Sequence, residues 1–215
     1  MNWKYRPKTI QAQLYNGNHN FGAPTKSQLA EEHHHYYGRS WVLGRCMFET
    51  LLGVGVLPSN KILDFGCGSG RLAIWLAKFL DTGCYFGIES HFESIDAFLR
   101  YEIPLHKLQD KLITVSHDSN VNFEIFDTNF DVVVDAYASV HLNPQLISLF
   151  RLNMAKHTKM GGLYITCPEP IIIESLPIAG FMLERTLTSN CDLLSNSSQN
   201  PLTNWYIYRK ISQET

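Results

Sequence analysis

The stretch ILDFGCGSGRL, residues 62–72, places Gly66, Gly68 and Gly70 directly after an apolar run that contains Asp64. The apolar run is typical of a buried strand, and the apolar segment at 71–80 that follows is typical of a helix packed on a sheet. A sharp turn from strand to helix needs backbone angles that glycine adopts most cheaply. Glycines also let a ligand lie against the main chain near the helix N-terminus. The stretch therefore predicts a ligand-binding turn.

Strands and helices are expected to alternate on both sides of this turn. Apolar runs predict further strands at 84–89, 111–116, 130–136 and 161–167. Helices are expected at 40–52, closed by Gly53, at 90–100, with Ser90 and Glu93 as a capping box, and at 143–157, with Asn143 as the N-cap. This alternation is typical of βαβ units and a parallel sheet. Near the C-terminus, 181–188 and 204–210 leave no room for a helix between them and predict an antiparallel hairpin.

The composition is that of one soluble globular domain. The chain has 215 residues, 45% hydrophobic and 18% charged, and a net charge of -2, which argues against a strongly basic nucleic-acid surface. Five scattered cysteines without a CxxC pair predict a reduced chain in the cytoplasm, without a disulfide framework or a zinc site. The N-terminus lacks the apolar segment of a signal peptide, and no apolar run is long enough to span a membrane.

The N-terminal residues 1–39 are expected to form an arm or lid ahead of a domain at 40–215. Residues 1–30 are polar and predict an extended or mobile segment. The sequence EEHHHYYG at 31–38 leaves three interpretations open: a solvated or capping segment, a lid that lends one His or Tyr to the site, or a metal site. Three adjacent histidines cannot share one helical face, which argues against the metal site.

Acidic residues follow three of the predicted strands. Asp64 lies in the first, Glu89 closes the second and Asp118 follows the third, and open α/β sheets bind ligands at this edge. Glu89 is placed to take both hydroxyls of a ribose, and Asp118 to accept an adenine amino group. A dinucleotide site would prefer GxGxxG, and Asp64 would repel its pyrophosphate. A sulfonium cofactor with a free ammonium group fits this pattern better.

The ordered series of motifs resembles the class I S-adenosylmethionine-dependent methyltransferases. The segments that carry the resemblance are VLPSNKILDFGCGSGRLAIWLA, GIES, HD at 117–118, FDVVVDAYASVHL and KMGGLYIT, over residues 55–166, and the closing hairpin extends it to about residue 210. The resemblance implies an α/β fold, a Rossmann-like three-layer αβα sandwich whose seven-stranded, mostly parallel sheet has an antiparallel C-terminal strand. It implies S-adenosyl-L-methionine as cofactor and S-adenosyl-L-homocysteine as product. SVHL and YGRSW are similar to small enzymes that methylate metabolites or sugars.

The same resemblance implies a role for each matching residue. The glycine turn would bind the methionine end of the cofactor, the end of the second strand its ribose, and the end of the third strand its adenine. Residues at the end of the fourth strand would line the rest of the cofactor site. Two residues ahead of the domain would cover the methionine carboxylate. The implied cofactor-binding residues are Asp64, Gly66, Cys67, Gly68, Gly70, Glu89, Ser90, His117, Asp118, Asp135, Ala136, Tyr137, Tyr37 and Arg39.

His141, after the fourth strand, is the candidate general base, because an alcohol or phenol acceptor benefits from a base that titrates near neutrality. A helix-capping or partly buried histidine is the competing interpretation. Glu169 is a second candidate on the substrate side, or a solvated acid. Cys167 is expected to pack as a small hydrophobe rather than act as a nucleophile. No metal ligand set is expected in the cleft.

These observations predict an S-adenosylmethionine-dependent methyltransferase that acts on a small-molecule acceptor, through O-methylation with a His general base. Two other classes stay open: a cofactor-binding protein without transferase activity, and an RNA methyltransferase, for which Lys4, Arg6, Lys8 and Lys26 are the only basic indication. A monomer or homodimer without a membrane or nucleic-acid partner is expected.

Overall fold

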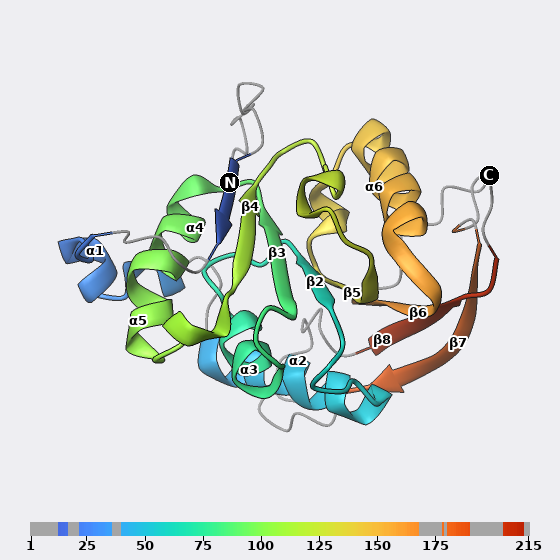
Figure 1. The fold of residues 1–215 in the computed structure, drawn as a ribbon, viewed down its shortest axis with the longest axis horizontal. Coiled ribbons are helices and arrows are strands. Elements are labelled where there is room, and N and C mark those ends of the chain that lie inside the picture. Colours follow the sequence, from blue (N-terminus) through green and yellow to red (C-terminus); the bar gives the residue numbers. More distant parts are fainter. Residues whose placement is uncertain are drawn as a thin grey trace.

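A computed structural model describes residues 13–16, 22–35, 40–167, 178, 180–189 and 204–212. Its centre is a single sheet of eight strands in the order β1-β4-β3-β2-β5-β6-β8-β7 (Figure 1). The strands are β1 Gln13–Asn16, β2 Ile62–Phe65, β3 Tyr85–Glu89, β4 Thr114–His117, β5 Phe130–Ala136, β6 Thr158–Cys167, β7 Phe181–Thr188 and β8 Asn204–Lys210.

Strands β4, β3, β2, β5 and β6 are parallel to one another, while β8 runs antiparallel to both β6 and β7. The predicted fold class is therefore confirmed, and so is the C-terminal hairpin. The predicted count of seven strands is wrong by one, because β1 from the N-terminal arm pairs antiparallel with β4 at the edge of the sheet. The chain leaves β2 for β3 on one side and later returns to β5 on the other, which makes the end of β2 a topological switch point.

Helices cover both faces of the sheet (Figure 1). They are α1 Lys26–Leu29, α2 Ser40–Val54, α3 Ala73–Phe79, α4 Phe92–Ala97, α5 Ile103–Leu105 and α6 Pro144–His157, with a π-helical turn at Phe98–Glu102 between α4 and α5 and short 3₁₀ turns at Glu32–His34, Gln109–Lys111, Glu124–Phe126 and Ser139–His141.

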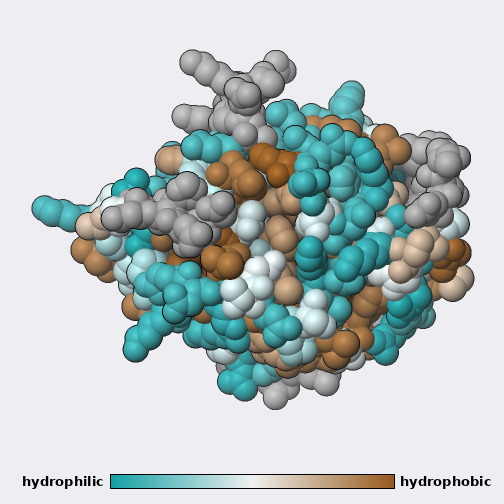
Figure 2. Space-filling view, in the orientation of Figure 1, coloured by the Kyte–Doolittle hydropathy of each residue, from teal (hydrophilic) through white to brown (hydrophobic). Residues whose placement is uncertain are grey.

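Alternate residues of each strand enter two separate hydrophobic cores, as the period-2 geometry of a strand requires. Ile62 packs in the core that contains residues of α2, α3 and α4. Leu63 and Phe65 pack in the core that contains residues of α6. Both faces of β2 are thus buried, which explains its uninterrupted apolar sequence. The surface seen in Figure 2 mixes hydrophilic and hydrophobic side chains.

Two of the three predicted helix boundaries are wrong in detail. Helix α2 runs past Gly53 and ends in a Schellman motif at Gly55, whose φ of 97° requires glycine and whose N–H donates to the Leu52 carbonyl. The N-cap of α4 is His91 and not Ser90, because the Ser90 hydroxyl instead donates to Glu89. Asn143 is confirmed as the N-cap of α6, where its side chain accepts from the Leu146 N–H.

The described part of the N-terminal arm is more ordered than the predicted extended segment. Lys26–Leu29 is helical because Thr25 and Gln28 form a reciprocal capping box. This short helix is fixed to α4 by a hydrogen bond of 2.8 Å from the Gln28 amide to Asp96. The predicted division at residue 39 stays a prediction.

Cys46 in α2 is disulfide-bonded, whereas Cys67, Cys84 and Cys167 are free. The expectation of a fully reduced chain is therefore wrong at Cys46, and the cytoplasmic location, which rested on it, stays a prediction. Within the described ranges, no helix has the length and apolar character needed to cross a membrane.

Candidate cofactor-binding site

The glycine turn after β2 is shaped by conformation and by close packing. Gly66, Gly68 and Gly70 all have positive φ values, of 75°, 55° and 92°. A Cβ on Gly66 would lie 2.3 Å from the Cβ of Ala138, and one on Gly70 would lie 2.4 Å from the Phe98 ring. Glycine is thus required at 66 and 70 for two independent reasons, and the predicted close turn is confirmed.

Glu89 links this turn to the end of β3. Its carboxylate accepts from the Gly68 N–H at 3.0 Å, from the His91 N–H at 2.8 Å and from the Ser90 hydroxyl at 3.3 Å. These bonds hold the carboxylate directly beside the glycine backbone. The geometry fits an acid that receives the hydroxyls of a ribose laid across the turn.

Asp64 is almost fully buried at the bottom of the same edge and accepts a hydrogen bond of 2.8 Å from the Tyr85 hydroxyl. The pKa of Asp64 is raised to about 7, chiefly by burial; the Tyr85 hydrogen bond lowers it, and the negative charges of Glu89 and Asp135 add to the rise. Carboxylates that repel one another in a dry crevice are stabilised by a cationic ligand and destabilised by an anionic one. The crevice therefore suits a ligand that brings a positive charge.

Tyr85→Phe should shift the pH dependence of cofactor binding to higher pH. The Tyr85 hydroxyl lowers the pKa of Asp64 by bonding its ionised form, so its removal raises that pKa above the wild-type value of about 7. Calorimetric titrations with S-adenosylhomocysteine between about pH 5.5 and 9 measure the midpoint. A midpoint that stays in place or falls would show that Asp64 does not control binding.

At the end of β4, Asp118 and His117 are held by local backbone contacts. Asp118 accepts from the Asn120 N–H at 3.0 Å and from the Asn122 N–H at 2.6 Å, which stabilises the turn after the strand. His117 places Nε2 at 3.1 Å from the Ser90 carbonyl oxygen and lies against the Phe92 ring. The register pairs His117 with Glu89, so both residues lie at the same edge as the glycine turn.

Asp135, at the end of β5, has a structural role that the sequence did not indicate. One of its oxygens accepts from the N–H groups of Ala138 and Ser139, both at 3.0 Å, and the other accepts from the Tyr164 hydroxyl at 3.0 Å. Asp135 therefore shapes the loop that carries Tyr137, and its negative charge reaches Asp64.

The loop after β5 presents Tyr137 and His141 to solvent. Tyr137 has a φ of 67°, which is costly for a non-glycine residue, and its N–H donates to the Cys167 carbonyl at 2.6 Å. The rings of Tyr137 and His141 meet edge to face with centroids 5.5 Å apart. The structure thus brings the candidate base to the same end of the sheet as the glycine turn, beside a tyrosine in a strained conformation.

The remaining predicted residues divide into three groups. Ala136 is partly buried at the end of β5. Cys67 is buried, with its sulfur packed over Gly87 and donating a hydrogen bond of 3.9 Å to the Gly68 carbonyl. The predictions for Tyr37, Arg39 and Glu169 lie outside the described residues.

Sequence reasoning missed Tyr85, Phe98 and Ala138, which support the site from below and beside it. Tyr85 resembles any core aromatic in the sequence, and only the register of β3 against β2 brings its hydroxyl to Asp64. One signal was available in the sequence. Tyr85 is a tyrosine in an otherwise apolar strand, next to the strand that carries Asp64, and buried tyrosine hydroxyls usually form a hydrogen bond.

The sheet is mostly parallel with a reversed C-terminal strand, a glycine turn follows its central strand, and an acid closes the next strand. These features define a class I S-adenosylmethionine-dependent methyltransferase architecture, which confirms the resemblance. The model of the family described as "Tellurite resistance protein TehB" matches residues 29–176 of this chain, and the chain belongs to that family.

Individual relatives agree with this class. A protein from Schizosaccharomyces pombe described as an uncharacterized methyltransferase is 29% identical over 123 residues, which are 56% of this chain and 43% of the relative. A ribosomal protein L11 methyltransferase from Bacillus cereus (strain Q1) is 31% identical over 137 residues, which are 61% of this chain and 41% of the relative. The aligned part of the chain spans less than half the length of these two relatives.

Solved structures share the fold at low identity. Magnesium protoporphyrin IX methyltransferase from Synechocystis PCC 6803 superposes with a TM-score of 0.61 at 15% identity, over 88% of this chain and 99% of that one. The N-methyltransferase NodS from Bradyrhizobium japonicum WM9 gives 0.60 at 13% identity, over 87% and 98%. The fold of these enzymes is therefore the fold of this chain.

Proposed function

We propose that this protein binds S-adenosyl-L-methionine at the ends of β2, β3 and β4 and transfers its methyl group to a hydroxyl of a small-molecule acceptor. One observation supports the cofactor: buried acids lie around the glycine turn, and burial, with a further contribution from the charges of Glu89 and Asp135, raises the pKa of Asp64 to about 7. A pyrophosphate would add negative charge to this crevice. A cofactor with an ammonium and a sulfonium group relieves the repulsion.

Each part of the cofactor has its own binding residues in this proposal. Asp64 receives the ammonium group, directly or through water, and Glu89 receives the ribose hydroxyls beside the Gly68 N–H. His117 and Asp118 flank the adenine. Residues 1–39 serve as the arm that covers the methionine end, which is supported by the hydrogen bond that fixes Gln28 of this arm to Asp96 of α4.

When bound, S-adenosylmethionine would supply a methyl group on a cationic sulfur and, in that sulfur, a leaving group that becomes a neutral thioether. The protein aligns the acceptor, excludes water and removes one proton. His141 accepts the proton of the hydroxyl as the new C–O bond forms. The Tyr137 ring, packed edge to face against His141, orients the imidazole.

The transferase is tested with S-adenosylmethionine that carries a labelled methyl group. The acceptors are a panel of small hydroxyl compounds, tellurite because of the family's description, a purified ribosomal protein and RNA. Label in a small-molecule product is expected. Label confined to RNA or protein would overturn the acceptor class, and cofactor binding without transfer to any acceptor would identify a non-catalytic binding protein.

His141→Gln should lower turnover by about 100-fold at neutral pH while cofactor affinity stays unchanged, because the variant keeps the shape of the loop and loses the base. Steady-state rates with the best acceptor, together with calorimetry, separate the two effects. His35→Gln, an exposed histidine of the N-terminal arm, is the control and should keep the wild-type rate. Wild-type turnover by His141→Gln would remove the residue from catalysis.

A further inference from the structure

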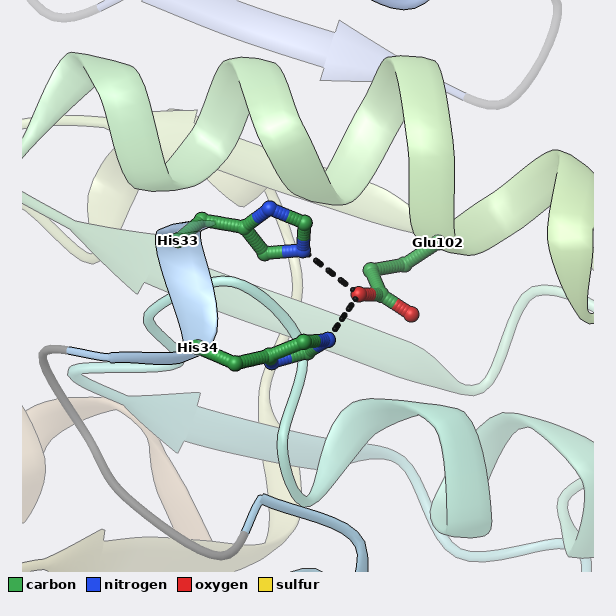
Figure 3. A group of neighbouring side chains, drawn as sticks. All are labelled: His33, His34 and Glu102. Atoms are coloured by element: carbon green, nitrogen blue, oxygen red, sulfur yellow. Dashed lines mark hydrogen bonds and ion pairs between the residues drawn. The ribbon is translucent and has the colours of Figure 1, made fainter. Parts of the chain in front are cut away.

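A cluster of imidazoles surrounds one buried carboxylate where the N-terminal arm meets the helical layer. His33 and His34, from the 3₁₀ turn Glu32–His34, place Nε2 at 2.7 and 2.8 Å from the same oxygen of Glu102 (Figure 3). The Glu102 side chain is only 1% exposed. Two segments that lie 69 residues apart in the sequence therefore converge on a single oxygen atom.

Glu102 occupies an unusual place in its helix. It is the last residue of the π-helical turn Phe98–Glu102, which is followed by Pro104 in the first turn of α5. Pro104 has no N–H to donate to the preceding turn, which accounts for a local change of helical winding. Such π turns occur frequently at functional sites because they redirect a side chain that a regular helix would place elsewhere.

Glu102 has an unusual set of partners within the described part of the chain. Its ion-pair partners there are histidines alone, and imidazoles can be neutral at physiological pH. Its Oε2 atom is buried without a hydrogen bond among the described residues, and so are Nδ1 of both His33 and His34. A buried carboxylate with partners of this kind is costly unless a cation joins it.

The contact between His34 and Glu102 has the distance of a hydrogen bond but not its direction. Nε2 lies 2.8 Å from Oε1, yet no described group forms a hydrogen bond with that nitrogen. A nitrogen and an oxygen held this close without an aligned N–H are arranged as two ligands of a common ion are.

His106 supports the cluster from outside it. The Lys78 ammonium lies 3.3 Å from Nδ1 of His106 and can only donate, so Nδ1 accepts and Nε2 carries the proton of a neutral ring. That Nε2 lies 3.3 Å from the second oxygen of Glu102. His106 thus lies beside the cluster as a further ion-pair partner of Glu102, without a hydrogen bond to it.

We propose that His33, His34 and Glu102 form a binding site for a divalent transition-metal ion such as Zn²⁺. Two imidazole nitrogens and one carboxylate oxygen form a donor set that suits zinc and its neighbours and leaves a position for water or another ligand. The three donor atoms lie within 4.8 Å of one another. An ion about 2.0–2.1 Å from each donor needs donor separations of about 3.3 Å, so small side-chain rotations open the cluster enough.

The proposed site departs from the sequence argument against chelation by EEHHHYYG, which stays a prediction. That argument required the histidines to share a helical face among themselves. His33 and His34 instead meet a carboxylate from a distant helix, while His35 is exposed. The sequence also predicted that the cofactor cleft holds no metal ligands. That prediction concerns a different place, because the His33, His34 and Glu102 cluster lies between the N-terminal arm and the helical layer.

An ion in this site would fasten residues 22–35 to the π-helical turn. Two hydrogen bonds already join the same segments: Gln28 to Asp96 at 2.8 Å and the Tyr101 hydroxyl to Glu31 at 2.9 Å. Metal binding to the folded state alone raises the melting temperature by mass action. The proposed ion is therefore structural, and its effect is measurable without an assay of activity.

The test uses the whole protein after dialysis against a chelator. Titration with ZnCl₂ should show one ion per chain and a higher melting temperature, and MgCl₂ should show neither because magnesium prefers all-oxygen sites. The double variant His33→Ala/His34→Ala should weaken zinc binding at least tenfold, whereas His35→Ala, in the same tract but outside the cluster, should bind as the wild type does. Circular dichroism checks that the variants fold.

Should the double variant fail to fold, Co²⁺ bound to the wild type decides the question. Nitrogen and oxygen ligands give visible d–d bands without the near-ultraviolet charge-transfer band of a thiolate, and a thiolate band would place the ion on a cysteine. The proposal is overturned if the wild type binds no zinc, if the folded double variant binds it as tightly, or if His35→Ala removes the binding.

Discussion

Asp64→Asn should weaken cofactor binding by roughly 10- to 100-fold, because it replaces a charged partner of the ammonium group whose hydrogen bond is worth about 1.5–3 kcal/mol. The same change should stabilise the ligand-free protein. Asparagine keeps an acceptor for the Tyr85 hydroxyl but removes a buried charge that Glu89 and Asp135 repel. Lower cofactor affinity together with higher stability of the ligand-free protein would indicate that Asp64 serves cofactor binding and not the fold.

The pH dependence follows from the direction of the shift. Burial first, and then neighbouring charges, raise the pKa of Asp64 from 3.8 to about 7, so the folded state holds this proton more tightly than the unfolded chain does. The associated stability is fully present below about pH 4 and is lost as the pH rises through 7. Asp64→Asn should lack this loss, and at pH 8 it should be about 1–3 kcal/mol more stable than the wild type.

Denaturant unfolding at pH 5, 6, 7 and 8, with and without S-adenosylhomocysteine, measures both effects. Asp110→Asn, an exposed acid of the 3₁₀ turn Gln109–Lys111, is the matched control and should change neither quantity. If Asp64→Asn left cofactor affinity intact or destabilised the ligand-free protein at pH 8, Asp64 would be a structural residue only.

Gly66→Ala should destabilise the protein by about 2–5 kcal/mol and weaken cofactor binding at least tenfold, because it combines backbone strain with a clash. The residue has a φ of 75°, and the new Cβ would lie 2.3 Å from that of Ala138. Ala138 cannot retreat freely, since its N–H is bonded to the buried Asp135.

Two further variants separate strain from clash. Gly83→Ala has the same kind of positive φ, 79°, in open space, and should cost only about 1–2 kcal/mol without an effect on binding. Gly66→Ala/Ala138→Gly removes the clash and should recover part of the lost stability and affinity. If the added Ala138→Gly change recovered neither stability nor cofactor affinity, the contact between residues 66 and 138 would not be the cause of the loss.

The local sequence was sufficient for the elements that depend on periodicity and on short-range backbone chemistry. The apolar runs of β2 and β5, the glycine turn and the Asn143 cap all follow from contacts within a few residues or from burial on both faces. The position of Glu89 beside the turn also followed, because parallel strands end at one edge of the sheet.

Features that depend on distant partners were not predictable from the sequence. Ser90 matched a capping box, but Glu89 competes for its hydroxyl. Gln13–Asn16 gave no strand signal and pairs with β4 only because the folded sheet offers an open edge. The convergence of His33 and His34 on Glu102 joins segments 68 to 69 residues apart, and no local pattern marks such a pairing.

The central claim is that the ends of β2, β3 and β4 bind an adenosyl cofactor that carries a positive charge. Calorimetric titration of the wild type at pH 8 with S-adenosylmethionine, S-adenosylhomocysteine and NAD⁺ tests it most directly. We expect one site per chain with micromolar affinity for the first two ligands and no binding of the third. Binding of NAD⁺, or a folded protein that binds neither methionine-derived ligand, would contradict it.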